Sequence, residues 1–311
     1  MTSTLRREVA FPSDGVTCCA WAYIPDERVA RPAPCIVMAH GLGGTRNASL
    51  EPYAERFVRS GFFVVLFDYR YLGDSDGEPR QLISIARQLE DWAAAIAFAR
   101  SMPDVDAARI ALWGCSLSGG HVMVAAARDH RIAAISAQCP MLDGAASSRM
   151  VAQQQGYGTL IALASAALTD VTRATLGQSP YYVPLIAPPG ELAAMSTTDA
   201  YTGCSAIVPP GWPNEVAARL FFSLPLYRPV RYAGAVECPA LLITCEKDTV
   251  VSSRAAMDAA TRMGSKARLV SLPIGHFEIY LGEWLERSSA EQIAFFKDVL
   301  LNADTGACES V

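Results

Sequence analysis

Three reactive side chains lie within four consecutive positions of the stretch IALWGCSLSGGHV, just after a short apolar run. They are Cys115, Ser116 and Ser118. A nucleophile on a tight strand-to-helix turn needs small residues two positions before and two positions after it, because the backbones approach closely there. Cys115 has tryptophan and leucine at those positions, which excludes it as the nucleophile.

The length of the preceding strand separates the two serines. Ser116 is flanked by Gly114 and Ser118, and Ser118 is flanked by Ser116 and Gly120, so both are sterically acceptable. The apolar run IALW ends at Gly114, and a nucleophile on such a turn follows about two residues later. This spacing favours Ser116 and leaves Ser118 as the alternative. The helix that follows would place its N-terminus beneath the reacting carbonyl, where it stabilises an oxyanion.

A serine nucleophile needs a general base, and the chain contains four histidines. His276 lies in LPIGHFEIY, between the last predicted strand and the last predicted helix, where strand ends of an open α/β sheet gather active residues. His40 opens a glycine loop whose backbone could supply an oxyanion donor, and we assign it an orienting role. His121 lies on the helix after Ser116 and His130 follows that helix. We therefore predict His276 as the base.

The third catalytic group should be a carboxylate at a strand end between the serine and the histidine. Asp248 follows the predicted strand ALLITCE and precedes His276 by 28 residues, which is the length of one strand–helix–strand unit. Asp143 ends the preceding strand and is a competitor, although we interpret it as a helix N-cap or a residue of the cap junction. Asp248 is the predicted partner of His276.

Two other groups of polar or reactive side chains are interpreted as structural. The aspartates of FDYRYLGDSDGEPR suit Asx turns and helix capping; they are Asp68, Asp74 and Asp76. Four of the nine cysteines sit in apolar runs and are typical of small buried hydrophobes; they are Cys35, Cys139, Cys238 and Cys245. No cysteine or histidine pair has zinc-ligand spacing, so we expect neither a metal nor a cofactor.

Short apolar runs alternate with amphipathic, helix-length segments along most of the chain. The runs cover residues 35–40, 62–69, 110–114, 133–139, 240–246 and 267–273. A strand–turn–strand pattern surrounds Ser13-Asp14-Gly15-Val16 near the N-terminus. Continuous apolar strands alternating with helices predict a parallel sheet covered on both faces.

The alternation stops between residues 141 and 235, which are rich in Gly, Pro, Ser, Thr and Tyr. More than 90 residues is too long for a loop of a compact domain. We predict an inserted, mainly helical cap over 141–235, with helices near 158–177 and 214–227. The two parts of the core would then be 1–140 and 236–302, followed by a flexible tail at 303–311.

The composition excludes several functional classes. The 311 residues are 51% hydrophobic and 18% charged with a formal net charge of −5, which is typical of a globular protein without a nucleic-acid surface. The N-terminus has no apolar signal segment, and no run approaches the length of a membrane span. We expect a cytoplasmic protein, and a homodimer stays open.

The motifs HGLGG, GCSLSGG, EKDTVV and GHFEIY, in that order, resemble the α/β-hydrolase superfamily. The resemblance extends to a branch of dienelactone-hydrolase-like esterases and fungal polyketide transferases. Two departures stand out. Ser118 replaces the second glycine of G-x-S-x-G, and Ser116 stands where dienelactone hydrolases proper have cysteine.

The resemblance implies an α/β-hydrolase fold with a mostly parallel eight-stranded sheet flanked by helices. It also implies an acyl-enzyme on Ser116, with the backbone N–H groups of Leu42 and Leu117 as the oxyanion hole. The aromatic, uncharged loops of the 141–235 region favour an apolar ester or lactone as the small-molecule substrate. Acyl transfer to another acceptor, and thioester, peptide or C–C bond hydrolysis, remain alternatives with the same catalytic groups.

Overall fold

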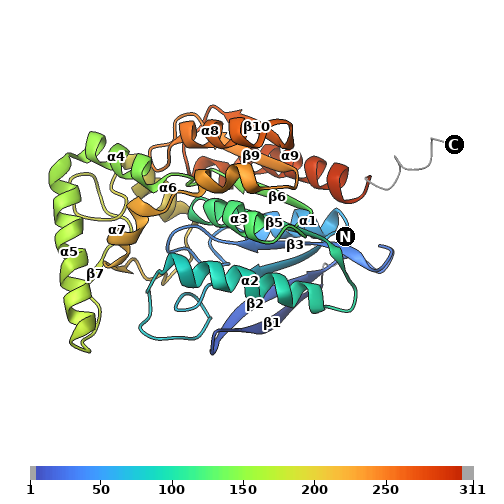
Figure 1. The fold of residues 1–311 in the computed structure, drawn as a ribbon, viewed down its shortest axis with the longest axis horizontal. Coiled ribbons are helices and arrows are strands. Elements are labelled where there is room, and N and C mark those ends of the chain that lie inside the picture. The colour runs from blue at the N-terminus through green and yellow to red at the C-terminus, as the bar shows by residue number, and fades with distance from the viewer. Residues whose placement is uncertain (1–4, 303–311) are drawn as a thin grey trace.

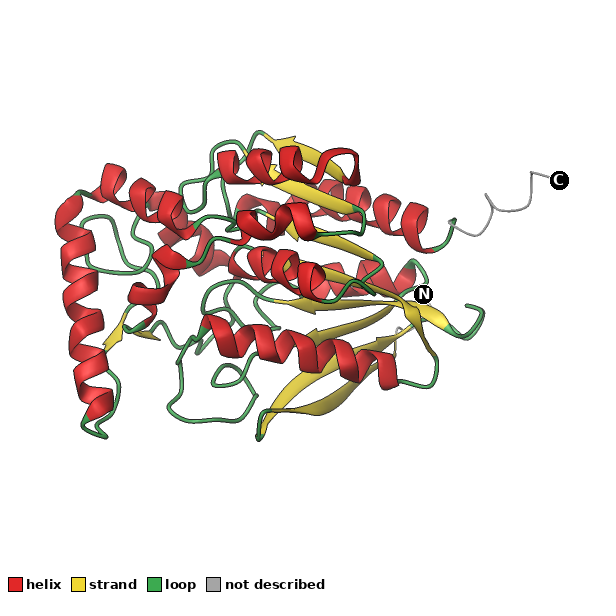
Figure 2. Cartoon of the chain, viewed as in Figure 1, coloured by secondary structure: helices red, strands yellow, loops and turns green. Residues whose placement is uncertain are grey.

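A computed structural model describes residues 5–302 of the chain, and its centre is an eight-stranded sheet (Figures 1 and 2). The strand order is β1-β2-β4-β3-β5-β6-β9-β10. The strands are β1 (Leu5–Ser13), β2 (Val16–Ile24), β3 (Ala33–Ala39), β4 (Phe63–Phe67), β5 (Val105–Cys115), β6 (Ala134–Gln138), β9 (Ala240–Cys245) and β10 (Ala267–Leu272). The last six strands in this order, from β4 to the edge strand β10, pair in parallel, which confirms the predicted sheet.

The first two strands form the predicted hairpin. Ser13 pairs with Val16, and the turn residues Asp14 and Gly15 both have positive φ (48° and 78°). A two-residue turn with this geometry matches the twist of the flanking strands. β2 also runs antiparallel to β4, so the sheet is mixed at this edge and parallel over the remainder.

Helices cover both faces of the sheet because the side chains of each strand alternate between two apolar clusters. In β3, Cys35 and Val37 face the cluster that includes Trp92, whereas Ile36 and Met38 face the cluster that includes Phe57. The first cluster is covered by α2 (Ile85–Ser101), α3 (Leu117–Arg128) and α8 (Ser253–Met263), and the second by α1 (Glu51–Arg59) and α9 (Gly282–Leu300). This burial on both faces explains the continuous apolar strands.

The 141–235 segment leaves the sheet after β6 and returns before β9. Its helices α4, α5 and α7 lie together at one end of the sheet, on the left of Figure 1. The segment contains α4 (Gly144–Gln155), α5 (Tyr157–Thr175), β7 (Tyr182–Val183), α6 (Thr198–Ile207), β8 (Val216–Ala217), α7 (Leu220–Ser223), and the 3-10 helices η1 (Leu224–Leu226) and η2 (Pro229–Ala235). Two further 3-10 helices lie in the core, η3 (Gly264–Lys266) and η4 (Glu278–Tyr280).

Of the two helices predicted in this segment, one is confirmed and the other is wrong. The helix predicted near 158–177 is α5. The helix predicted near 214–227 is wrong: residues 216–217 pair with β7 as a strand, and the four-residue α7 that follows passes into a 3-10 turn at Pro225, whose ring interrupts helical hydrogen bonding. Two more helices, α4 and α6, were not predicted, and they begin at side-chain caps from Asp143 and Thr197.

The 141–235 segment packs both against the sheet domain and on itself. Leu185 and Leu220 belong to one of the two clusters that flank the sheet, and Ile186 and Cys204 belong to the other. A small cluster around Leu163 is the segment's own. The boundaries of the segment as a domain stay a prediction, as does the tail at 303–311, which lies outside the described residues. None of the helices within residues 5–302 is both long and apolar enough to cross a membrane.

Candidate active site

Ser116 occupies a strained turn between β5 and α3. Its φ of 53° and ψ of −121° are unusual for a residue with a side chain. Small neighbours make the turn possible, since a Cβ at Gly114 would lie 2.3 Å from the carbonyl oxygen of Ser118. A Cβ at Gly41 would lie 2.8 Å from the Cβ of Ser116 itself. Close packing around this turn therefore requires glycine both at 114, just before Ser116, and at 41, in the loop after β3.

The other two candidates of the opening stretch are placed differently. The hydroxyl of Ser118 is buried and shares a hydrogen bond of 2.8 Å with the hydroxyl of Tyr69. Cys115 is buried at the end of β5, and burial raises the pKa of its thiol to about 11. A thiol with such a pKa carries little thiolate at neutral pH, so Cys115 is a poor nucleophile.

His276 and Asp248 are joined by a hydrogen bond of 2.6 Å between Nδ1 and Oδ2. The side chains of both residues are almost fully buried, and the residues follow the neighbouring parallel strands β10 and β9. The other carboxylate oxygen of Asp248 accepts hydrogen bonds from the backbone N–H of Val250 (2.7 Å) and Val251 (2.8 Å). The carboxylate is therefore fixed on both sides, and it holds the Nδ1–H tautomer of His276 with Nε2 free to accept a proton.

Ser116 and His276 border the same small cavity, of about 50 Å³. Across residues 5–302, no hydrogen bond reaches the Oγ of Ser116, and His276 Nε2 also lacks one. In unliganded hydrolases the contact between nucleophile and base is often longer than in the complex with substrate. The structure thus brings Ser116 and His276 to one cavity without joining them directly.

Two backbone N–H groups beside Ser116 have no backbone acceptor in the described part of the chain. One belongs to Leu117, the first residue of α3, and the other to Leu42, in the loop after β3. Both residues also border a second, larger cavity together with Ser116. The positive end of the α3 dipole points to the same place, which is a favourable environment for an oxyanion.

The larger cavity has a volume of about 310 Å³ and extends from Ser116 into the 141–235 segment. No charged side chain is among the described residues that line it. Apolar side chains dominate; they include Met141, Val151, Leu160, Leu163, Phe221 and Leu224. Met195, like Ser116 and Leu42, borders both cavities and so lies between them. The volume is within the range of about 300–1,000 Å³ of small-molecule sites.

The surroundings of the other three histidines do not suit a general base for Ser116. His121 is fully buried and shares hydrogen bonds with the Tyr227 hydroxyl (2.7 Å) and the Gln88 side chain (3.0 Å). Burial lowers the pKa of His121 to about 3 and that of His40 to about 4, so both rings are neutral at physiological pH. His130 is exposed, 3.5 Å from a carboxylate oxygen of Glu237.

Two predictions about aspartates have opposite outcomes. Asp143 caps the N-terminus of α4 through the N–H of Ala146, as expected, and also pairs with Arg228. Asp68 does stabilise a turn, since it accepts a hydrogen bond from the N–H of Asp74, but the helix-capping interpretation is wrong because the N-cap of α2 is Ser84. The sequence interpretation also missed a partner, because the carboxylates of Asp68 and Asp74 both bind Arg46. That partner lies more than 20 positions upstream, beyond the reach of local sequence patterns.

Cys139 lies beside the Asp248–His276 pair, and the three ligand atoms lie within 4.8 Å of one another. Burial and the neighbouring thiol of Cys245, 3.1 Å away, raise the pKa of Cys139 well above its usual range. A protonated thiol is a weak metal ligand, and the Nδ1 of His276 is already engaged by Asp248. The donor set therefore suits a proton relay better than a metal.

The fold and the sequence agree with a known family. The sequence model of the X-Pro dipeptidyl-peptidase (S15 family) matches residues 14–180, which include Ser116. The chain belongs to this family of α/β hydrolases. The family and its fold make the chain an enzyme with hydrolase or acyl-transfer chemistry.

Individual relatives and a solved structure support the same branch. The quorum-quenching protein AidA of Acinetobacter baumannii is 44% identical over 94% of this chain and 95% of its own length. The polyketide transferase af380 of Aspergillus fumigatus is 28% identical over 94% of this chain and 98% of its own. The crystal structure of the α/β hydrolase GrgF from Penicillium sp. sh18 is similar, with a TM-score of 0.81 and 25% identity over 95% of this chain and 99% of that one.

Proposed function

We propose that the protein is a serine hydrolase that cleaves a neutral ester, lactone or thioester with an apolar acyl group. The observation that carries this proposal is the position of Ser116 at the junction of an uncharged, mostly apolar cavity and a small cavity bordered by His276. The larger cavity takes the acyl chain. The smaller cavity takes the leaving group and then the water that replaces it.

The catalytic steps follow from this arrangement. The Oγ of Ser116 attacks the acyl carbonyl while Nε2 of His276 takes its proton. Asp248 stabilises the imidazolium and keeps the ring in the Nδ1–H tautomer through the 2.6 Å hydrogen bond. His276 then protonates the leaving group, and the acyl-enzyme is released when water, deprotonated by the same ring, attacks the carbonyl.

The negative charge of the tetrahedral intermediate is stabilised by the N–H groups of Leu42 and Leu117. Each such donor contributes roughly 3–4 kcal/mol to the transition state in other hydrolases. Leu117 adds the dipole of α3 to its own N–H. In this proposal the 141–235 segment is the cap that forms most of the acyl cavity.

Labelling and turnover together test the proposal. A fluorophosphonate probe should label the wild-type protein and fail to label Ser116→Ala. The matched control is Ser118→Ala, whose buried hydroxyl contacts Tyr69 instead of the cavities, and this variant should still be labelled. Persistent labelling of Ser116→Ala with loss in Ser118→Ala would reassign the nucleophile.

Acyl transfer is the second candidate function, favoured by the polyketide transferase among the relatives. Its first step is the same, and only the acceptor differs. A panel of p-nitrophenyl esters, thioesters and lactones of increasing acyl length, with and without added alcohols, separates the two. Hydrolysis that is unaffected by alcohols supports the hydrolase, whereas new ester products formed faster than free acid support the transferase.

A further inference from the structure

The loop after β3, residues 40–50, carries Leu42 and is called here the oxyanion loop. It joins β3 to α1 and contains no helix or strand of its own. A backbone donor of an oxyanion hole is effective only when it is already aimed at the developing charge. The oxyanion loop therefore needs support from residues outside it, and that support is the subject of the inference below, which rests on the proposed function.

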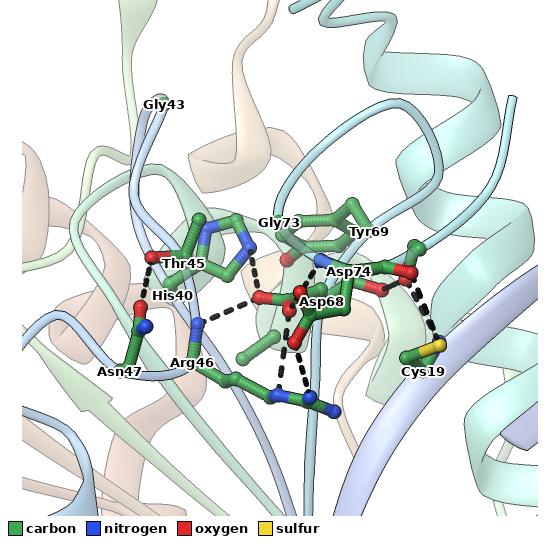
Figure 3. Close-up of polar contacts among 12 residues, drawn as sticks. Cys19, His40, Gly43, Thr45, Arg46, Asn47, Asp68, Tyr69, Gly73 and Asp74 are labelled. Atoms are coloured by element: carbon green, nitrogen blue, oxygen red, sulfur yellow. Dashed lines mark hydrogen bonds and ion pairs between the residues drawn. The ribbon is translucent and has the colours of Figure 1, made fainter. Parts of the chain in front are cut away.

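Asp68 contacts the oxyanion loop at two points (Figure 3). It follows β4, the parallel neighbour of β3, so Asp68 and His40 leave the sheet side by side. The Oδ1 of Asp68 accepts a hydrogen bond of 2.7 Å from the backbone N–H of Arg46 and lies 3.7 Å from Nε2 of His40. One buried carboxylate thus touches the residues at both ends of the stretch that contains Leu42.

The side chain of Arg46 strengthens the first contact. Its Nε lies 3.5 Å from Oδ2 of Asp68, and its Nη2 lies 2.6 Å from Asp74 and 3.1 Å from Glu8. The guanidinium also stacks 4.6 Å above the ring of Trp21 on β2. Arg46 is therefore held by three carboxylates and an aromatic ring, although it belongs to a loop.

The ring of His40 makes the second contact. Its Nδ1 is 3.0 Å from the carbonyl oxygen of Gly41, which can only accept, so Nδ1 carries the proton. Its Nε2 is buried, lies 3.7 Å from Oδ1 of Asp68 and has no hydrogen-bond partner in the described chain, so this approach is a packing contact without a hydrogen bond. Tyr69 packs edge-on against the ring, with 4.8 Å between centroids. The hydrogen bond to Gly41 and the packing of Tyr69 fix the peptide that leads into Leu42.

Gly73 shows how closely the carboxylate is fitted. A Cβ at this position would lie 2.3 Å from Oδ2 of Asp68, and the φ of Gly73 is 53°. The N–H of the next residue, Asp74, donates to the same oxygen at 3.3 Å. The 68–74 turn therefore wraps around the carboxylate of Asp68 with no room for a side chain.

We propose that Asp68 is a positioning residue for acyl transfer, because it holds Arg46 through the backbone N–H and the guanidinium, packs beside His40, and thereby keeps the Leu42 N–H aimed at the reacting carbonyl. Asp68 does not touch the substrate. The effect of its loss should appear in kcat, where the oxyanion is stabilised, and much less in KM.

A second buried pair provides a matched control. Asp91 on α2 is fully buried, pairs with Arg70 at 2.7 Å, and accepts a hydrogen bond from Ser13. None of its described contacts is with the oxyanion loop. Asp68→Asn and Asp91→Asn therefore remove the same charge from similar surroundings, and only the first should alter the oxyanion hole.

The test compares the two variants by thermal unfolding and by kcat and KM for a p-nitrophenyl ester. It also compares their rates of inactivation by diethyl p-nitrophenyl phosphate, whose phosphoryl oxygen occupies the oxyanion hole. We expect kcat and the inactivation rate of Asp68→Asn to fall about 10- to 100-fold with little change in KM. Asp91→Asn should lose stability and retain kcat. Equal loss of kcat in both variants, or unchanged kcat in Asp68→Asn, would overturn the proposal.

If Asp68→Asn does not fold, Gly73→Ala displaces the same carboxylate without removing its charge. Its control is Gly15→Ala, where φ is also positive (78°) but nothing lies within 4 Å of the added Cβ. Only Gly73→Ala should lower kcat. A failure of the proposed function itself gives a different result. In that case the wild-type protein would neither turn over the ester nor be inactivated by diethyl p-nitrophenyl phosphate, before any variant is compared.

Discussion

The proposed catalytic groups and the acyl cavity are built by two regions with different support. Ser116, Asp248 and His276 follow strands of the parallel sheet, and β5, β6 and β9 are buried along the parts that adjoin the site. Most of the residues that line the larger cavity instead come from the 141–235 segment. The outer face of its helix α5 exposes Tyr157, Ile161 and Leu168 to solvent.

This difference means that reaction and substrate range can change independently. A shift of one strand end would disturb the contact of His276 with Asp248 and would affect every substrate. A changed side chain on α4 or α5 would alter the length of the acyl chain that fits, while the reacting groups stay in place. The predictions below test this separation, from the largest expected effect to the smallest.

Asp248→Asn should reduce kcat by about 10⁴-fold, because an amide in place of the carboxylate favours the wrong tautomer of His276 and does not stabilise the imidazolium. The variant should stay folded, since its carbonyl oxygen can still accept from Val250 and Val251. Turnover of p-nitrophenyl acetate and octanoate measures the loss. A similar loss for both esters supports the separation of the two regions, and a loss confined to one ester contradicts it.

His121 connects the sheet domain to the 141–235 segment, because its ring on α3 is hydrogen-bonded to the hydroxyl of Tyr227. Its pKa is lowered to about 3 in the folded protein by burial, against an unfolded value of about 6.5. The unfolded chain therefore binds a proton below pH 6.5 that the folded chain does not, and stability falls as the pH falls. Between pH 7 and pH 5 this amounts to about 2 kcal/mol.

Chemical denaturation of wild type and His121→Gln at both pH values measures this effect as a difference. The difference is needed because two other buried groups titrate in the same range. His40, whose pKa is lowered to about 4 by burial, has the same sign. Asp68, whose pKa is raised to about 6 by burial, has the opposite sign, since its contribution is lost as the pH rises. If wild type and variant lose stability equally, His121 is not the titrating group.

Leu163→Trp should narrow the larger cavity, because Leu163 on α5 is buried and borders it. We expect kcat/KM for p-nitrophenyl octanoate to fall about tenfold while that for the acetate changes little, as is usual when a pocket loses space for one or two methylenes. The matched control is Leu168→Trp on the exposed face of the same helix. Equal losses for both esters would mean that the cavity does not take the acyl chain.

The positions of the reactive residues could be predicted from the sequence because they depend on local rules. Buried strands are continuous apolar runs, and the residue after each strand end of a parallel sheet must come to the same edge. This reasoning brought Asp248 and His276 together across 28 residues. To predict the strained turn at Ser116, it was enough to compare the sizes of the residues two positions before and two positions after each candidate.

The contacts that were missed depend on tertiary packing. The Arg46–Asp68 pair joins two loops, and nothing near FDYRYLGDSDGEPR indicates an arginine partner upstream. The helices α4 and α6 both contain Gly and Ser, and α6 also contains Thr, which are weaker helix formers than Ala or Leu, so both helices depend on their caps and on tertiary packing. Long-range contacts of this kind leave no periodic pattern in the sequence.

The smallest predicted effect concerns Trp212, one of the residues of the 141–235 segment that contact the oxyanion loop. Its indole Nε1 donates a hydrogen bond of 2.8 Å to the carbonyl oxygen of Gly43, next to Leu42. Trp212→Phe removes this bond and keeps most of the ring, so kcat should fall about two- to fivefold, the worth of one neutral hydrogen bond. The fall should be the same for acetate and octanoate esters, because the bond supports the oxyanion hole instead of the acyl chain. A fall that grows with acyl length would instead place Trp212 in substrate binding.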